Sequence, residues 1–202
     1  MYRHFVKRLL DIVLSLAALA VLAVPMGIFA LMIKREDRGP ALFRQKRVGI
    51  HKRHFDMYKF RSMKMDTPHD VPTHLLADPE QYLLKRGKWM RKYSIDELPQ
   101  IINILKGDMS IVGPRPALWN QYDLIAERDK YGANDIRPGL TGWAQINGRD
   151  ELEIPEKAKY DGEYVKRESL MFDAMCIFRT VFSAARHEGV VEGGTGSLNR
   201  NK

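Results

Sequence analysis

Residues 94–116 read SIDELPQIINILKGDMSIVGPRP, and the rest of the chain is organised around this stretch. At its centre, Asp96 and Glu97 stand side by side at an expected helix start, directly after a run of Lys and Arg. Ser94 and Glu97 have the spacing of a capping box, in which the two side chains bind free amides at a helix N-terminus. Carboxylates among cations also suit a site for phosphate and a metal ion. On spacing alone, the capping interpretation is favoured.

The residues after the acid pair predict a helix that ends near Gly107. The apolar positions recur at helical spacing and are expected to face a core: Ile95, Leu98, Ile101, Ile102 and Leu105. Asp96, Gln100 and Asn103 fall on another face. Pro99 is compatible with Asp96 as N-cap but would remove one helical hydrogen bond if Ser94 were the cap, so both caps stay open. Either cap puts the acid pair at the positive end of the helix dipole.

Cations also occur in the turn that follows this helix and in the predicted β-hairpin that precedes it. After the helix, Gly113-Pro114-Arg115-Pro116 holds one arginine between two prolines, which suits a guanidinium for phosphate contact. Before it, ALFRQ and HFDMYKF frame the turn-like RVGIHKR and predict a β-hairpin over residues 41–60. Strand alternation puts Lys59 and Arg61 on one face, where both could grip a phosphate. Taken alone, a solvated basic face is the favoured interpretation of that pair.

A membrane segment precedes the hairpin. Residues 12–33 contain no charge and are long enough for a helix across a bilayer core of about 30 Å. Cations lie on both flanks, so the positive-inside rule does not orient the segment. We favour a re-entrant hairpin that turns back at Pro25, with both ends on the cytoplasmic side. A kinked spanning helix is the main alternative, and a cleaved signal peptide is disfavoured because the apolar run continues well beyond Ala20.

The charge distribution suggests an anionic partner. The chain has 202 residues and a net charge of +8, but residues 1–94 hold 19 Lys/Arg against 8 Asp/Glu. Both a lipid surface and nucleic acid fit such a basic half. The basic run over residues 85–92 includes Trp89 and Met90, a mixture typical of interfacial helices, and the membrane segment argues against nucleic acid. The single Cys176 excludes an intrachain disulfide and fits a reducing compartment.

Three long motifs resemble the bacterial sugar transferase family, the monotopic phosphoglycosyl transferases that act on polyprenyl phosphate. They are KFRSM, RKYSIDELPQIINILKGDMSIVGPRP and IRPGLTGWAQINGR, and the similarity extends from residue 7 to residue 189. The resemblance implies transfer of a sugar 1-phosphate from a nucleotide diphosphate sugar, usually a UDP-sugar, to polyprenyl phosphate with release of UMP. This is a first membrane step of bacterial glycoconjugate assembly. Motifs of this length outweigh the capping interpretation of the acid pair.

The resemblance also implies roles for individual residues. Asp96 corresponds to the nucleophile of the family, which forms an aspartyl phosphosugar intermediate, and Glu97 to a Mg²⁺ ligand. The cations expected to bind diphosphate or polyprenyl phosphate are Lys59, Arg61, Arg91 and Arg115. The membrane segment of the family is a re-entrant helix broken at a Ser-Pro pair. This chain has Val24-Pro25 instead, so the kink must depend more on Pro25 and Gly27.

The C-terminal half contains weaker candidates. Residues 117–131 predict an amphipathic helix containing Leu118, Tyr122 and Ile125. The glycine content of residues 136–149 predicts no regular element, and the segment offers candidate substrate contacts or a structural loop anchored by Trp143. Those candidates are Arg137, Trp143, Gln145, Asn147 and Arg149. Asp161, which forms an Asp-x-x-Tyr pattern with Tyr164, and Asp173 match family acids and are expected to support the site or the fold.

The last helical pattern covers residues 169–187 and carries an apolar stripe, which either packs in the core or lies at the membrane interface. The stripe consists of Met171, Ala174, Met175, Phe178, Val181, Phe182 and Ala185. Residues 189–202 are expected to be a disordered tail.

The sequence therefore predicts a mostly helical α/β enzyme of the bacterial inner membrane. It has a membrane helix over residues 1–38 and a cytoplasmic catalytic domain over residues 39–188 with interfacial helices. Its expected partners are a nucleotide sugar, polyprenyl phosphate and membrane lipids, with Mg²⁺ as cofactor and without nucleic acid. Self-association as a homo-oligomer and the identity of the sugar stay open. The alternatives are a non-catalytic basic protein of the membrane surface and a hydrolase of nucleotide sugars.

Overall fold

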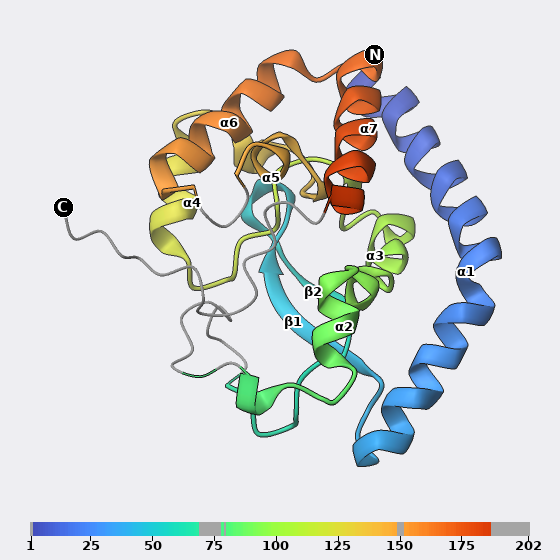
Figure 1. Ribbon diagram of the computed structural model, residues 1–202. Coiled ribbons are helices and arrows are strands. Elements are labelled where there is room, and N and C mark those ends of the chain that lie inside the picture. The colour runs from blue at the N-terminus through green and yellow to red at the C-terminus, as the bar shows by residue number, and fades with distance from the viewer. Residues whose placement is uncertain (1, 69–77, 79, 149–151, 187–202) are drawn as a thin grey trace.

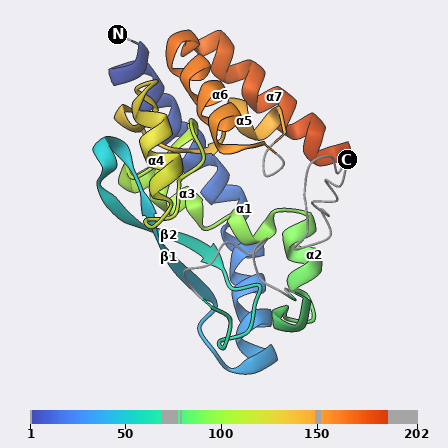
Figure 2. The ribbon, with the colours of Figure 1, turned by 90° about the vertical axis from the view of Figure 1, so that its left-hand side faces the viewer.

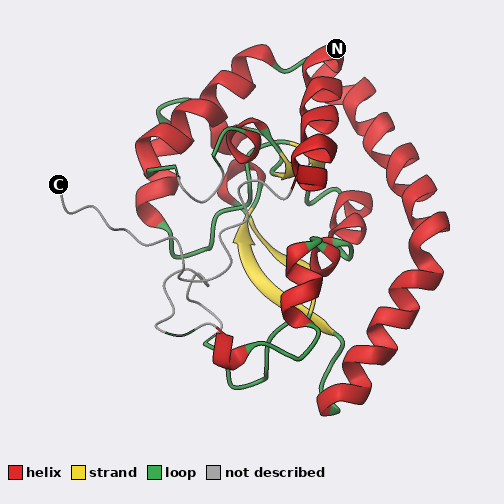
Figure 3. Cartoon of the chain, viewed as in Figure 1, coloured by secondary structure: helices red, strands yellow, loops and turns green. Residues whose placement is uncertain are grey.

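A computed structural model describes residues 2–68, 78, 80–148 and 152–186, with the side chains of residues 4, 37 and 183–186 excepted. Helices predominate, and the described residues form two small sheets (Figure 3). The helices are α1 (Lys7–Asp37), α2 (Gly87–Lys92), α3 (Gln100–Lys106), α4 (Tyr122–Asp129), α5 (Trp143–Ile146), α6 (Ile154–Arg167) and α7 (Leu170–Arg186). The strands are β1 (Leu42–Val48), β2 (His54–Phe60), β3 (Ser110–Val112) and β4 (Gly139–Thr141). The prediction of a mostly helical chain is confirmed.

Helix α1 is a single helix that continues through Pro25 and arcs along one side of the molecule (Figure 1). A proline inside a helix removes one backbone donor, and this chain accommodates that loss without leaving the helix. The described part of α1 therefore contains no reversal at Pro25. By length and composition, α1 could cross a membrane. Its exposed apolar residues include Val13, Leu14, Leu16, Val21, Val24, Ile28 and Leu31.

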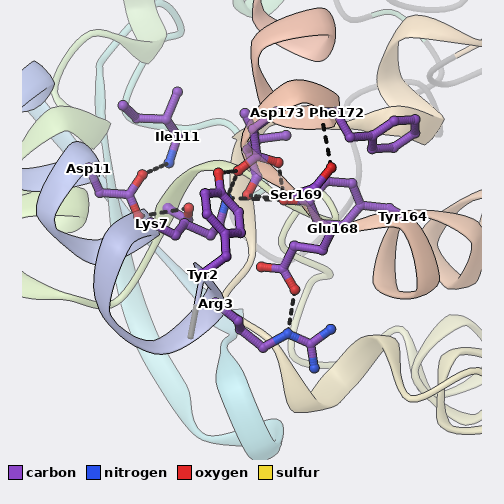
Figure 4. Close-up of polar contacts among 12 residues, drawn as sticks. Tyr2, Arg3, Lys7, Asp11, Ile111, Tyr164, Glu168, Ser169, Phe172 and Asp173 are labelled. Atoms are coloured by element: carbon purple, nitrogen blue, oxygen red, sulfur yellow. Dashed lines mark hydrogen bonds and ion pairs between the residues drawn. The ribbon is translucent and has the colours of Figure 1, made fainter.

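The start of α1 is bound to the C-terminal half of the chain. The Lys7 ammonium forms an ion pair with Asp173 and donates a hydrogen bond to the Tyr164 hydroxyl at 3.0 Å (Figure 4). The Asp11 carboxylate accepts hydrogen bonds from the Ser110 hydroxyl at 2.8 Å and from the Ile111 amide at 2.9 Å. In Figures 1 and 2, α5, α6 and α7 gather at the end of the molecule that holds the start of α1.

The end of α1 is held by the same domain. Ile33 is buried in a core cluster that also contains Phe60 and Met90, and Phe29 packs against this cluster. The Glu36 carboxylate accepts a hydrogen bond from the Lys85 amide. One folded domain therefore binds both ends of the apolar helix, whereas the outer face of the helix between them stays exposed.

Strands β1 and β2 pair in antiparallel register from Leu42 opposite Phe60 to Val48 opposite His54. The β-hairpin predicted over residues 41–60 is confirmed. Its turn contains a short 3-10 helix at Ile50–Lys52, with His51 and Lys52 in the left-handed region. The basic run over residues 85–92 was predicted to be helical, and α2 confirms this for Gly87–Lys92. Trp89 is half exposed, but Met90 is buried in the core and is therefore not an interfacial residue.

Residues 136–149 contain regular structure, so the prediction of an irregular loop was wrong. Strand β4 pairs in parallel with β3, and α5 follows directly. The glycines allow two backbone segments to approach closely, because a Cβ on Gly139 would lie 2.1 Å from the Gly113 amide nitrogen. A Cβ on Gly142 would lie 2.0 Å from the Gly113 carbonyl oxygen. The glycines are thus needed for packing between segments rather than for loop freedom.

The remaining helices differ from the predicted patterns in detail. Helix α4 is shorter than the helix predicted over residues 117–131, because Leu118 forms an isolated β-bridge with Arg47 and lies before the helix begins. Leu118 is buried, whereas Tyr122, at the start of α4, is exposed. On α7, Phe172, Asp173 and Cys176 face the interior. Much of the predicted stripe instead faces outward, and its exposed large residues are Met171, Phe178, Val181 and Phe182. The exposed stripe favours the interfacial interpretation over the core interpretation.

The Asp11 contacts yield a test of how α1 is held. Asp11→Ala should destabilise the protein by about 2 to 4 kcal/mol, because it leaves the buried Ser110 hydroxyl and the Ile111 amide without their acceptor. Asp11→Asn, which keeps one carbonyl oxygen, should lose less. Thermal midpoints in detergent measure the effect, with the exposed Asp135→Ala as control. Equal midpoints for Asp11→Ala and the control would contradict this account.

Candidate active site

The acid pair lies in a turn of unusual backbone conformation. Ser94 has a φ of 53° in the left-handed region, and Ile95–Glu97 form a 3-10 turn that runs into α3 through Leu98 and Pro99. The Glu97 amide donates to the Ser94 backbone carbonyl at 3.1 Å, and the Ser94 side chain makes no capping bond. The capping box is therefore absent. Pro99, which lacks an amide hydrogen, is the N-cap residue of α3, so neither Ser94 nor Asp96 caps it.

Glu97 joins three segments that are distant in the sequence. Its Oε1 accepts a hydrogen bond from the Lys59 ammonium of β2 at 3.1 Å. The same oxygen accepts one from the Arg115 guanidinium, in the turn after β3, at 2.9 Å. Charge-assisted bonds of this kind are the stronger hydrogen bonds in proteins. The structure thus brings together four of the predicted site residues: Lys59, Asp96, Glu97 and Arg115.

Asp96 is as buried as Glu97 but lacks such partners. Both residues are 8% exposed, and Asp96 has no hydrogen bond or ion pair with any residue that the structure describes. Burial raises the pKa of Asp96, and Glu97 raises it further, whereas Lys59, Arg91 and Arg115 oppose this rise. Asp96 is therefore a buried carboxylate in a positive field, with its oxygens available for a ligand.

Two of the surrounding cations have distinct environments. Burial lowers the pKa of Lys59, and Arg115 acts in the same direction, whereas Glu97 and Asp96 oppose it. Arg91, from α2, donates to the Met63 sulfur at 3.4 Å and contributes to the field at Asp96. Lys59 therefore binds the acid pair directly at Glu97, whereas Arg91 acts on Asp96 through its electrostatic field.

Three other predicted phosphate or substrate ligands bind backbone carbonyls instead. Arg61 is 4% exposed and donates to the Pro40 carbonyl at 2.7 Å. Arg137 donates to the Gly107 carbonyl at 3.0 Å, where α3 ends. Gln145 donates to the Leu140 carbonyl at 2.9 Å. These contacts support the fold, and substrate contact by these side chains stays a prediction. Arg149 lies outside the described residues.

The two acids that were expected to support the site or the fold, Asp161 and Asp173, make structural contacts. Asp161 is 1% exposed and binds the Arg128 guanidinium at 2.7 and 2.8 Å. Burial raises the pKa of Asp161, and Arg128 opposes the rise. Asp173 accepts hydrogen bonds from the Tyr2 hydroxyl at 2.5 Å and the Tyr164 hydroxyl at 2.7 Å (Figure 4). Both acids hold helices together.

Trp143 anchors the segment after β4. Its indole nitrogen donates to the Glu163 carboxylate at 3.0 Å, and its ring lies 5.0 Å from that of Phe172. Asn147 donates to the Trp143 backbone carbonyl at 2.7 Å. The alternative of a structural loop anchored by Trp143 agrees with these contacts, although the segment is partly helical.

A metal ion at this site would depend on few protein ligands. The described residues contain no group of three or more His, Cys, Asp or Glu side chains that could hold one. Asp96 and Glu97 are the carboxylates available, and one Glu97 oxygen already binds two cations. Such a sparse donor set fits Mg²⁺, which commonly uses one or two carboxylates together with substrate phosphates.

Comparison with known proteins connects this site to one family. Residues 2–187 match the model of the bacterial sugar transferases. The chain is 38% identical over 184 residues to an uncharacterized sugar transferase, EpsL, of Bacillus subtilis, covering 91% of this chain and 89% of that protein. It is 40% identical over 187 residues to the UDP-glucose:undecaprenyl-phosphate glucose-1-phosphate transferase of Escherichia coli.

The chain covers unequal shares of these relatives. That alignment covers 89% of this chain but 40% of the Escherichia coli protein. A third relative, the undecaprenyl-phosphate glucose phosphotransferase of Komagataeibacter xylinus, is 38% identical over 185 residues, which are 87% of this chain and 35% of that protein. The chain thus spans most of the EpsL protein and well under half of the two larger relatives.

The unusual environment of Asp96 yields a stability test. Asp96→Asn should raise the thermal midpoint at neutral pH, because burial disfavours the charged carboxylate and the amide is neutral. The pKa of Asp96 in the folded state lies above its ordinary value of 3.8, so the wild type loses stability as pH rises through the folded pKa. The advantage of the variant should therefore disappear as pH falls below the ordinary value. Melting curves across this pH range measure it.

The matched control is the neighbouring acid. Glu97→Gln should lower the midpoint at neutral pH, because Lys59 and Arg115 lose the charge that pairs with both of them. If Asp96→Asn also lowers the midpoint, then its neighbours stabilise the Asp96 carboxylate in the resting protein and the expectation is wrong.

Proposed function

The chain belongs to the bacterial sugar transferase family, and we propose that it transfers a sugar 1-phosphate from a nucleotide diphosphate sugar to a polyprenyl phosphate. The observation that carries the proposal is Asp96, a buried carboxylate without a protein partner in the field of Lys59, Arg91 and Arg115. The name of the Escherichia coli relative specifies UDP-glucose and undecaprenyl phosphate. By this similarity, the donor of this chain is a UDP-sugar and its acceptor is a membrane-embedded polyprenyl phosphate.

The proposed reaction proceeds in two displacements at one phosphorus atom. An oxygen of the Asp96 carboxylate attacks the sugar-bearing phosphorus, and the bond from this phosphorus to the bridging oxygen breaks, so UMP leaves with the electron pair. A phosphate oxygen of the polyprenyl phosphate then attacks the same phosphorus and expels the Asp96 carboxylate. A covalent aspartyl intermediate divides one difficult transfer into two easier ones. The product begins the assembly of a glycoconjugate on its lipid carrier.

The neighbours of Asp96 have separate tasks in this scheme. Arg91 and Lys59 stabilise negative charge on the reacting phosphates, since such transfers depend mainly on positioning and electrostatic stabilisation. Arg115 acts with Lys59 and also orients Glu97. We propose Mg²⁺ as the cofactor, held by the carboxylates of Asp96 and Glu97 and by substrate phosphates, where it would neutralise the diphosphate.

We further propose that α1 enters the bacterial inner membrane and returns to the cytoplasmic face. Support comes from its two ends, since Lys7 and Asp11 at the start and Ile33 and Glu36 at the end all contact one folded domain. A charged domain of this size does not lie inside the bilayer, so both ends belong on one side. A bow-shaped helix with an apolar outer face satisfies this arrangement without a sharp reversal at Pro25. The exposed stripe of α7 and Trp89 of α2 would lie among the lipid headgroups.

The catalytic proposal is tested with purified protein and a panel of UDP-sugars. The wild type should release UMP from one of them and place its radiolabelled sugar in the lipid fraction when undecaprenyl phosphate is present. Asp96→Asn should reduce UMP release by roughly 10³-fold or more, because the amide cannot form the intermediate. The exposed Asp135→Asn serves as the control and should keep the wild-type rate.

Other outcomes of this experiment distinguish the alternatives. Wild-type UMP release by Asp96→Asn would contradict the assigned nucleophile. Radiolabel found only as free sugar phosphate, even with the lipid acceptor present, would favour a hydrolase. Lipid binding without any nucleotide release from the wild type would favour a membrane-surface binding protein.

The membrane arrangement is tested by cysteine labelling in intact cells. Phe5→Cys and Arg35→Cys mark exposed positions near the two ends of the apolar helix, and the native Cys176 is buried, so its background labelling should be low. Both cysteines should react with a membrane-impermeant maleimide only after the inner membrane is permeabilised. Val21→Cys, on the outer face of α1, should stay unreactive because it lies in hydrocarbon. Labelling of only one of the two end positions in intact cells would eliminate the re-entrant arrangement.

A further inference from the structure

The Pro114-Arg115-Pro116 turn, which carries one cation of the candidate site, can be held in few ways. Pro114 and Pro116 have no amide hydrogen, so only their carbonyl groups can form hydrogen bonds with the rest of the protein. The Pro114 carbonyl accepts a hydrogen bond from the Gly139 amide at 2.8 Å. The Pro116 carbonyl accepts one from Nη1 of Arg47 at 2.9 Å. Arg115 therefore lies between an anchor from the backbone of β4 and an anchor from an arginine side chain of β1.

Gln45 fixes the direction of the Arg47 side chain. The two residues are two positions apart on β1, so their side chains lie on the same face of the strand. Nε and Nη2 of Arg47 donate hydrogen bonds to Oε1 of Gln45 at 3.2 and 2.5 Å. The planar guanidinium thus binds Gln45 with two nitrogens and Pro116 with the third. A lysine ammonium on its flexible stem does not reproduce this arrangement.

The Arg47 guanidinium also lies near the cations of the site. Gln45 is opposite Met57 in the hairpin, so Lys59 is its diagonal neighbour on the same face. Because the Arg47 side chain extends along β1 to Gln45, its charge approaches Lys59. Burial lowers the pKa of Lys59, and the charges of Arg115 and Arg47 act in the same direction. Arg47 therefore contributes to the positive field of the site as well as to the contact with the turn.

Backbone contacts join β1 to the residues that follow the turn. The Val48 amide donates a hydrogen bond to the Ala117 carbonyl at 3.0 Å, and Arg47 forms an isolated antiparallel bridge with Leu118. Val48 and Ala117 are buried together in one core cluster. These contacts do not depend on the Arg47 side chain. Loss of that side chain should therefore loosen the turn without detaching residues 117 and 118 from β1.

We infer that Arg47 is a positioning residue for Arg115, because its hold on the Pro116 carbonyl sets the place of the Arg115 guanidinium. That guanidinium then meets Glu97 at 2.9 Å and is available to the donor diphosphate beside it. The inference rests on the proposed function, in which Arg115 acts with Lys59 on the reacting phosphates. A shift of about 1 Å in such a group can reduce a rate roughly 100-fold, so a turn that is held through two carbonyl groups needs both anchors.

The test is Arg47→Met, which preserves much of the side-chain length and removes all of its donors. The kcat/KM for UMP release from the UDP-sugar selected from the panel should fall about 10- to 100-fold, because Arg115 is no longer held in place. In an Arg115→Met background, the same change should reduce kcat/KM less than about twofold, because the residue through which Arg47 acts is already absent. Arg47→Lys, which keeps the charge and one donor group, should have a rate between those of the wild type and Arg47→Met.

A second measurement does not depend on catalysis. Amide deuterium uptake in residues 113–118 should rise in Arg47→Met, because the Pro116 carbonyl loses its donor and the turn opens more often. The control is Arg44→Met, an exposed arginine of the same strand whose guanidinium lies over the Tyr58 ring. It should keep the kcat/KM and the deuterium uptake of the wild type. All rates are compared well below the thermal midpoints, and Arg47→Lys replaces Arg47→Met in both measurements if the latter does not fold.

Two outcomes would overturn the inference. If Arg47→Met reduces kcat/KM by the same factor with and without Arg115, then Arg47 acts independently of Arg115. Unchanged deuterium uptake in residues 113–118 would show that the Arg47 side chain does not hold the turn. Either result together with an inactive Asp96→Asn enzyme contradicts the role of Arg47 alone. Wild-type UMP release by Asp96→Asn would instead contradict the assigned nucleophile, and deuterium uptake would still decide whether Arg47 holds the turn.

Discussion

The contact of Glu97 with Lys59 and Arg115 fixes the geometry on which the rest of the site depends. It joins β2, the turn before α3 and the turn after β3 at a single carboxylate oxygen. Lys59 and Glu97 are largely buried, so removing the Glu97 charge would leave the Lys59 ammonium without its ion-pair partner at high cost. Because Glu97 takes the direct bonds of both cations, Asp96 lies in their field without being bound by them. The two adjacent carboxylates thereby acquire different roles: Glu97 holds the site together, and Asp96 keeps its oxygens for a ligand.

Local patterns in the sequence predicted the features that depend on neighbouring residues. Alternating β-formers gave the hairpin, and Gly107, with a φ of 92°, ends α3 where expected. The capping box was not formed because Ser94 adopts a left-handed conformation, which the Ser94–Glu97 spacing does not encode. Arg61 and Arg137 are predicted phosphate or substrate ligands, and in the structure both bind backbone carbonyls. Their partners, the carbonyls of Pro40 and Gly107, lie 21 and 30 residues away, and no sequence pattern identifies such distant acceptors.

The glycines of residues 136–149 and the polar face of α3 illustrate the same limit. Gly139 and Gly142 permit β4 to approach Gly113, but a single segment does not reveal which other segment approaches it. Asn103 was assigned to a face away from the apolar core, yet it is fully buried because Asp56 and Tyr58 of β2 satisfy its amide. In both cases the residue type indicated a special structural requirement. The role of the residue depended on a partner segment that only the fold brings close.

Burial alone does not distinguish Asp96, the proposed nucleophile, from the acids that make structural contacts. Burial raises the pKa of both Asp96 and Asp161. Asp161 is satisfied by the Arg128 guanidinium, and Asp11 is satisfied by a hydroxyl and an amide. The carboxylate of Asp96 has no such partner among the described residues, and the amide of Gln100 one turn away has none either. Burial combined with the absence of a side-chain partner among the described residues, rather than burial or charge alone, is therefore the structural property that singles out Asp96.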